Sequence, residues 1–316
     1  MVPTKLLSQK KVLAHLLAVM LGSGWGYAAN ANPARQWRPV QPGKRKGISG
    51  LALVSQQAEM CQFLAVHDNK GNLDQPRLAL LNVPAHGPVT YQSLAWPSDH
   101  SPPLDLEALT VVPNTDQAEF LAVTSLGLAY HLRLEPQTQT VTVLHTVQIP
   151  PHTQLTNIEG FALQQINHQL IAVWAHRGQD AEPGILFWGK YYPQKAKIVA
   201  EGSTSFQVPW PLQQVRHVSD VKMASDGVLY ITAASDPGDQ GPFQSATYIV
   251  GQFPFRQPRP MTPSLERSTL VPLRRFPSHK VEAIELVPGK RGGIVWASDD
   301  ETFGSSLAGQ CGDEPN

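Results

Sequence analysis

The sequence has few charged side chains, two cysteines and no net charge over its 316 residues. Charged residues make up 16% of the chain, against about 25% in typical soluble domains. No basic stripe marks a nucleic-acid or anionic membrane surface. Beyond the first thirty residues, no apolar run approaches the roughly 20 residues of a membrane span. We therefore expect no nucleic-acid partner and no membrane span after removal of a signal peptide.

Helical periodicity and familiar nucleophile motifs are also missing. No stretch after the first thirty residues sustains a 3.6-residue apolar period, and neither Gly-x-Ser-x-Gly nor His-Glu-x-x-His occurs. The absence of these two motifs disfavours serine hydrolases with a Gly-x-Ser-x-Gly nucleophile elbow and zinc proteases with a His-Glu-x-x-His helix. The 28 prolines and 24 glycines are spread along the whole chain, which is typical of many short strands and turns. The chain is predicted to be all-β.

The N-terminus has the pattern of an export signal. Lys5, Lys10 and Lys11 form a positive region, residues 12–21 are apolar, and Ala29-Asn30-Ala31 is a small-x-small site. We predict a signal peptide over residues 1–31 and a periplasmic or secreted protein. An uncleaved membrane anchor is the alternative.

A two-strand unit then recurs five times. In its clearest copy, residues 157–163 form one strand and residues 170–174 the next. The equivalent head residues of the five units are Ser49, Glu107, Glu159, Ser219 and Glu282. Heads recur every 52 to 63 residues, whereas head and second-strand tip stay 17 to 19 residues apart. A fixed hairpin with adjustable loops predicts a β-propeller.

Five repeats predict a single five-bladed propeller over residues 47–316, preceded by an approach segment, residues 32–46. A sixth blade built from residues 198–200 and 206–208 is the alternative. Because about 15 residues follow the last tip, the approach segment is expected to supply an outer strand of the last blade and close the ring. We expect a monomer.

The two cysteines lie near opposite ends of this domain. Cys61 falls in the first unit and Cys311 follows the last. In an oxidising compartment they could pair and join the first blade to the last, closing a long loop that the chain-entropy model makes strongly stabilising. Two unpaired thiols are the alternative.

Equivalent inner-strand positions form a ring around the propeller axis, so the five heads should converge. Three carboxylates on one axis repel unless they are protonated or neutralised. Oxygen ligands in a site of six to eight suit calcium, and we predict Ca²⁺ at Ser49, Glu107, Glu159, Ser219 and Glu282. Two other roles stay open: hydrogen bonding to backbone N–H groups of neighbouring blades, and catalysis by the ring itself.

A second ring lies at the second-strand tips, where binding residues are commonly found. The candidate catalytic residues there are His67, Asp68, His176, Arg177, Asp236, Asp299 and Asp300. Arg177, together with His67 or His176, could bind an anionic group such as phosphate. The acidic run Asp299-Asp300-Glu301 could hold a second cation or act as a base. The other polar residues of this second ring are Asn69, Thr124, Ser125, Ser235, Ser298 and Glu301.

Four of the heads resemble those of the phytase-like (esterase-like) propellers of exported bacterial proteins, a resemblance that covers residues 47–301. They are Asp105-Leu-Glu-Ala-Leu, Asn157-Ile-Glu-Gly-Phe, Val218-Ser-Asp-Val and Val281-Glu-Ala-Ile. The order Ser, Glu, Glu, Ser, Glu is also similar to that of calcium-activated apyrases. The resemblance implies an axial calcium ion and phosphate chemistry at the propeller mouth. The Asp-Asp-Pro-Ala and Arg-His-Gly motifs are absent, and His67-Asp68-Asn69-Lys70 replaces the Asp-Asp-Arg segment of apyrases.

Two functions follow from these residues. The first is a calcium-dependent hydrolase of phosphate esters, whose partner is a phosphorylated small molecule and whose metal and Arg177 neutralise the phosphoryl oxygens. The alternative is a non-catalytic propeller that binds a ligand or partner around a structural metal ion.

Overall fold

Five antiparallel sheets of four or five strands build the fold of this computed structural model. The structure describes residues 36–71, 74–150, 157–254, 262–265, 270–289 and 293–311. All of these belong to one compact unit, Pro33–Asn316. The predicted signal peptide, residues 1–31, lies outside the described residues. Within the described residues, no helix combines the length and the apolar character that a membrane span requires.

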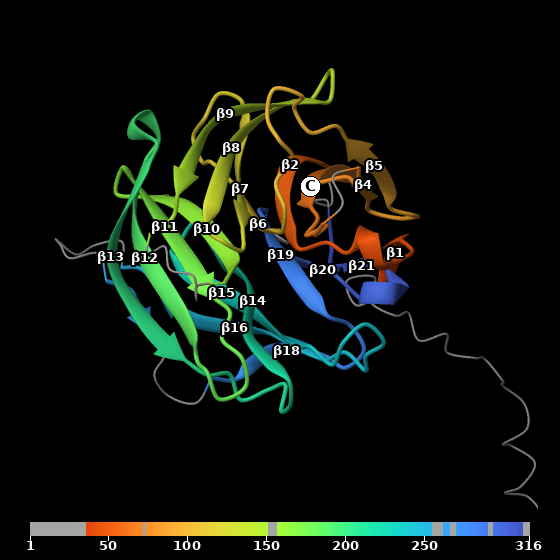
Figure 1. The fold of residues 1–316 in the computed structure, drawn as a ribbon, viewed down its shortest axis with the longest axis vertical. Helices are drawn as coiled ribbons and strands as arrows, with labels where there is room; N and C mark the ends of the chain where they lie inside the picture. The colour runs from red at the N-terminus through yellow and green to blue at the C-terminus, as the bar shows by residue number, and fades with distance from the viewer. Residues whose placement is uncertain are drawn as a thin grey trace, which may run out of the picture. The chain divides into compact units, whose positions relative to one another are not determined.

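The innermost strand of each sheet lines the centre of a ring. These strands are β2 (Gly50–Gln57), β6 (Leu106–Val111), β10 (Ile158–Ile166), β14 (Val215–Met223) and β19 (Val281–Val287). They pack against one another in cyclic order, β19 returning to β2, and the colours of Figure 1 pass around the ring from orange to blue. The chain is therefore a five-bladed propeller, as predicted. The material of the alternative sixth blade lies in or next to β13 (Lys197–Phe206), the outer strand of blade three.

The remaining strands follow outward in each blade. The second strands are β3 (Met60–Val66), β7 (Ala118–Thr124), β11 (Gln169–His176), β15 (Val228–Ser235) and β20 (Gly293–Ser298). The third are β4 (Leu78–Pro84), β8 (Leu128–Glu135), β12 (Gly184–Tyr192), β16 (Ser245–Gln252) and β21 (Ser305–Ala308). The outer ones are β5 (Thr90–Leu94), β9 (Thr140–Gln148), β13, β17 (Ser264–Leu265) with β18 (Pro272–Phe276), and β1 (Arg38–Gln41). Short 3₁₀ turns occur at η2 (Lys44–Lys46), η3 (Pro193–Lys195) and η4 (Glu301–Phe303).

The burial of the strands follows their place in the blade. Inner strands such as β6 are buried almost throughout, because both of their faces pack against neighbouring blades. The outer strand β13 exposes most of its side chains to solvent. Hydrophobic clusters fill the spaces between successive blades, so the core is divided among five interfaces.

The last blade contains both ends of the propeller. Strand β1 pairs with β21 in antiparallel register, and the red strand lies beside the blue one in Figure 1. Cys61 of β3 forms a disulfide with Cys311, with Cα atoms 5.8 Å apart and 250 residues between them in sequence. The predicted closure and the predicted disulfide are both confirmed.

Candidate functional site

The three head glutamates sit at irregularities in their strands. Glu107, Glu159 and Glu282 each coincide with a register shift between the first and second strands of their blades. Such a bulge leaves one residue unpaired in the ladder and turns its side chain. All three carboxyl groups are buried, at 5%, 2% and 4% exposure, and they interact electrostatically with one another. The predicted convergence of the glutamates is therefore observed.

Basic side chains lie beside each glutamate. Lys70 Nζ is 3.4 Å from Glu107 Oε1, and an Arg177 guanidinium nitrogen is 3.5 Å from Glu159 Oε1. Since these cations come from the protein itself, part of the repulsion among the glutamates is offset without any bound ion.

Glu282 has two basic partners. Its Oε1 lies 3.0 Å from Arg216 and 3.0 Å from Lys280 Nζ. Arg216 continues to Asp236 at 2.5 Å, and Lys280 to Glu301 at 2.5 Å. Arg216 belongs to blade four and Glu282 to blade five, so this network spans an interface between blades.

Asp105 and Glu107 form a carboxyl pair. Burial, with the charges of Glu159 and Asp105, raises the pKa of Glu107 well above its usual value. Burial would also raise the pKa of Asp105, but hydrogen bonds with Glu107, Lys70 and Ser125 outweigh it and lower that pKa. The hydrogen bond between them therefore joins a carboxyl group with a raised pKa to one with a lowered pKa. Asp105 Oδ1 is also 2.7 Å from Lys70 Nζ.

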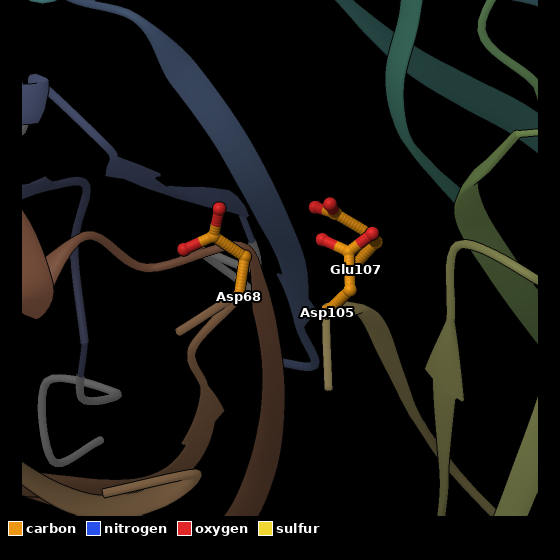
Figure 2. A group of neighbouring side chains, drawn as sticks. All are labelled: Asp68, Asp105 and Glu107. Carbon is orange, nitrogen blue, oxygen red and sulfur yellow. The ribbon is translucent and has the colours of Figure 1, made fainter. Parts of the chain in front are cut away.

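Asp68 completes a cluster of oxygen atoms with this pair. One oxygen from each of Asp68, Asp105 and Glu107 lies within 4.8 Å of the others, and Figure 2 shows Asp105 and Glu107 side by side with Asp68 facing them. Carboxylate oxygens are the ligand type that calcium takes, but these three supply only part of the six to eight that it needs. Lys70 Nζ contacts all three carboxylates, at 2.7 to 3.8 Å, so a cation there would have to displace the lysine. The calcium ion stays a prediction.

Burial also acts on the pKa of the second head glutamate, Glu159. Burial raises the pKa of Glu159 to about 7, against the opposing charge of Arg216. Burial also tends to raise the pKa of Asp236, but Arg216 and Lys280 outweigh it and lower that pKa. Near neutral pH, Glu159 therefore exchanges its proton, and the ionised Asp236 lies in the same network of charges.

The tip residues divide into two groups. Asp68, Arg177 and Asp299 interact with the glutamates, and Asp236 pairs with Arg216, which also pairs with Glu282. Burial, with the charge of Glu282, raises the pKa of Asp299 well above its usual value. These four predicted residues therefore join the heads at one end of the ring.

The other predicted tips are held by their own surroundings. His67 Nδ1 is 2.5 Å from the Gly47 carbonyl, and burial lowers the pKa of His67 to about 4. His176 Nδ1 accepts the N–H of Asn157 at 3.0 Å. Asp300 accepts the N–H of Lys280 at 2.8 Å. These contacts tie loops to strands, and none of them reaches a head glutamate.

The two head serines contribute hydroxyl groups rather than charges. Ser49 and Ser219 are each 1% exposed, and their Oγ atoms have no hydrogen-bond partner among the described residues. Their part in the predicted ring stays a prediction.

We call the twelve charged residues at this end of the ring the outer cluster. They are Asp68, Lys70, Asp105, Glu107, Glu159, Arg177, Arg216, Asp236, Lys280, Glu282, Asp299 and Glu301. Solvent reaches this cluster, because the Lys70 and Asp68 side chains are 61% and 33% exposed.

A second charged group lies one to three residues beyond the heads along the inner strands. Lys222 Nζ donates to the carbonyls of Leu51, at 2.9 Å, and Leu109. Asp220 accepts the N–H of Ile284 at 2.9 Å, and Glu285 is 3.8 Å from Lys222. We call Asp220, Lys222 and Glu285 the inner cluster. It ties blade four to blades one, two and five through main-chain groups.

Sequence reasoning did not select Lys70, Arg216 or Lys280 as site residues. Each lies within three positions of an acidic tip or a head: Lys70 follows Asp68 by two, Arg216 precedes Ser219 by three, and Lys280 precedes Glu282 by two. A search for basic residues beside the heads would have found them, because buried carboxylates need compensation.

Comparisons with known proteins identify the fold and no family. No family model matches the chain, and no curated protein matches it. The endo-arabinase from Bacteroides thetaiotaomicron is similar with a TM-score of 0.50 and 11% identity, covering 85% of this chain and 96% of that one. The catalytic domain of the α-L-arabinofuranosidase from Coprinopsis cinerea has a TM-score of 0.50 and 8% identity, covering 87% and 96%.

At such identities the likeness concerns the fold alone. The class that fold and site define is a five-bladed propeller with a charged cluster on its axis. The resemblance to phytase-like propellers and apyrases stays a prediction, as do export, calcium and the monomeric state.

Proposed function

We propose that the outer cluster is the active site of a hydrolase that cleaves glycosidic bonds by carboxylate acid–base catalysis. One observation carries the proposal: Glu159, whose pKa is raised to about 7, lies in one network with Glu282 and Asp236. A proton-holding carboxyl beside ionised ones is the set that glycoside hydrolysis uses. The two similar structures, an endo-arabinase and an α-L-arabinofuranosidase, support arabinofuranosides as the first substrate class to test.

Each residue then has a defined step. Glu159 gives its proton to the leaving-group oxygen as the bond from that oxygen to the anomeric carbon breaks. Asp236, ionised and with 29% of its side chain exposed, orients a water molecule and takes its proton as the hydroxyl group adds to that carbon. Glu282, fixed by Arg216 and Lys280, offsets the positive charge that develops on the sugar.

The charge balance is also compatible with a neutral substrate. The outer cluster contains eight carboxyl groups and four basic groups, and the pKa values of Asp68, Glu107, Glu159 and Asp299 are raised. Even with these four groups protonated, the basic groups do not outnumber the carboxylates. The cluster therefore has no net positive charge to attract a phosphate ester, whereas a sugar carries no charge. Arg177 faces Glu159 in this arrangement, so its guanidinium group is already engaged.

A second candidate, a calcium-dependent phosphoric ester hydrolase, is supported by the oxygen cluster of Asp68, Asp105 and Glu107. A divalent ion held there would reduce the excess negative charge and could bind a phosphoryl oxygen. Arg177 would be the residue of this chain that contacts the phosphate.

A substrate panel separates these candidates. The purified protein is incubated with p-nitrophenyl α-L-arabinofuranoside, other p-nitrophenyl glycosides and arabinan, and with p-nitrophenyl phosphate and inositol hexakisphosphate, each with calcium or with EGTA. We expect hydrolysis of a glycoside under both conditions. Glu159→Gln should lower kcat by about 10²- to 10⁴-fold, the usual contribution of a general acid.

The matched control is Glu201→Gln on the outer strand β13, where Glu201 pairs with Lys190 at 2.8 Å. This variant should retain the activity. Cleavage of phosphate esters alone, dependent on calcium, would replace the proposal with the second candidate. Turnover of neither class would leave a non-catalytic binding propeller.

A further inference from the structure

Three potential ligand atoms meet between blades two and three, away from the outer cluster. His131 Nδ1 lies 3.3 Å from His145 Nε2 and 3.0 Å from the Tyr191 hydroxyl oxygen, and the last two are 3.1 Å apart. We propose that His131, His145 and Tyr191 bind a divalent transition-metal ion of the kind that prefers imidazole, with Zn²⁺ and Cu²⁺ as the leading ions.

The triangle has the size that such a metal requires. Zinc binds nitrogen and oxygen ligands at about 2.0–2.2 Å, so two ligands of a tetrahedral site lie roughly 3.3 Å apart. The three observed separations are 3.0, 3.1 and 3.3 Å. One point about 2 Å from all three atoms therefore exists, and an ion there would have a fourth position for water.

The outer partners of His131 also fit a metal site. His131 Nε2 lies 3.0 Å from Glu119 Oε2, and Arg133 holds the other Glu119 oxygen at 2.8 Å. Metal-binding histidines commonly donate their second ring N–H to a carboxylate, which orients the ring and fixes the tautomer. With Nε2 donating to Glu119, Nδ1 presents its lone pair to the triangle.

The fold brings these residues together because adjacent blades pack against each other. His131 of β8 and His145 of β9 are direct cross-strand partners. Tyr191 comes from β12 of the next blade, 60 residues further along the chain than His131. His131 and Tyr191 are each 3% exposed, while His145 is half-buried. An ion bound there would join blades two and three.

The test uses full-length protein without an affinity tag, freed of metal by EDTA and dialysed. Titration calorimetry with Zn²⁺ should give one site with Kd below about 1 μM. His145→Gln and Tyr191→Phe should weaken binding by more than about 100-fold, and Glu119→Gln by about 10- to 100-fold, the usual effect of an outer partner. His168→Gln, which alters an exposed histidine in the β10–β11 turn, should bind like wild type.

A second measurement reads the ligands directly. Cu²⁺ should give a phenolate charge-transfer band in the visible spectrum that Tyr191→Phe abolishes and His168→Gln retains. Melting curves of the metal-free variants establish that each is folded. Absence of saturable binding by wild type, or equal affinity in all variants, would overturn the proposal and leave a hydrogen-bonded triangle between the two blades.

Discussion

In the outer cluster Lys70 contacts Asp105 and Glu107 with 61% of its side chain exposed, whereas in the inner cluster Lys222 donates to two main-chain carbonyls and is 4% exposed. The outer charges pair with other side chains. The inner charges satisfy backbone groups of three other blades. Similar residue types thus stabilise the ring in one layer and, under the proposed function, supply reactive groups in the other.

The hydrogen bond to a backbone N–H group of a neighbouring blade is made by a residue next to a head. The head glutamates were one candidate for hydrogen bonds to the N–H groups of neighbouring blades. Asp220, the residue after the head Ser219, makes that contact with Ile284. Glu107, Glu159 and Glu282 instead pair with Lys70, Arg177, Arg216 and Lys280.

The largest expected effect is on the stability of Lys222→Met. This change leaves Asp220 and Glu285 buried without their cation and two carbonyls without a donor. Breaking a buried charged network from one side costs about 3–5 kcal/mol. Urea unfolding at pH 8 measures it, and Lys70→Met is the matched control in the outer cluster, where an exposed lysine contributes at most about 1 kcal/mol. Equal losses in the two variants would contradict the division between the clusters.

A smaller effect is expected from Asp220→Asn, in the pH dependence of stability. Burial raises the pKa of Asp220 to about 7 in the folded protein, against the charge of Lys222, from about 4 in the unfolded chain. The folded state therefore holds the proton more tightly, and this contribution to stability is lost as pH rises from about 4 through 7.

Urea unfolding from pH 4 to 8 should show this decline in wild type and a flatter dependence in Asp220→Asn. The variant should also lose about 1–3 kcal/mol, because an amide can accept only one of the two N–H groups that Asp220 accepts. The same slope in both proteins would remove Asp220 as its source.

Much of the fold could be predicted from the sequence, because local patterns determine it. The spacing of the heads and tips predicts five hairpins, and the short segment after the last tip predicts closure by the N-terminal strand. Cys61 and Cys311 are the two cysteines of the chain. Their pairing could be predicted because a closed ring brings the first and last blades together.

The candidate site could be predicted only in part. Head positions follow from the repeat, but their partners depend on how loops fold back and how blades pack. Arg216 reaches Glu282 across 66 residues, and His131 meets Tyr191 across 60. The repeat does not encode either contact, since Arg216, His131 and Tyr191 lie outside the head and tip positions.

The most direct test of the outer cluster as an acid–base site is the pH dependence of kcat/KM, measured from pH 5 to 9 on the glycoside that the panel identifies. Because Glu159 must carry its proton and its pKa is about 7, the wild-type rate should fall on the alkaline side with an apparent pKa near 7. The residual activity of Glu159→Gln should lack this limb. A wild-type rate that is constant from pH 6 to 8, or an unchanged alkaline limb in Glu159→Gln, would contradict the account.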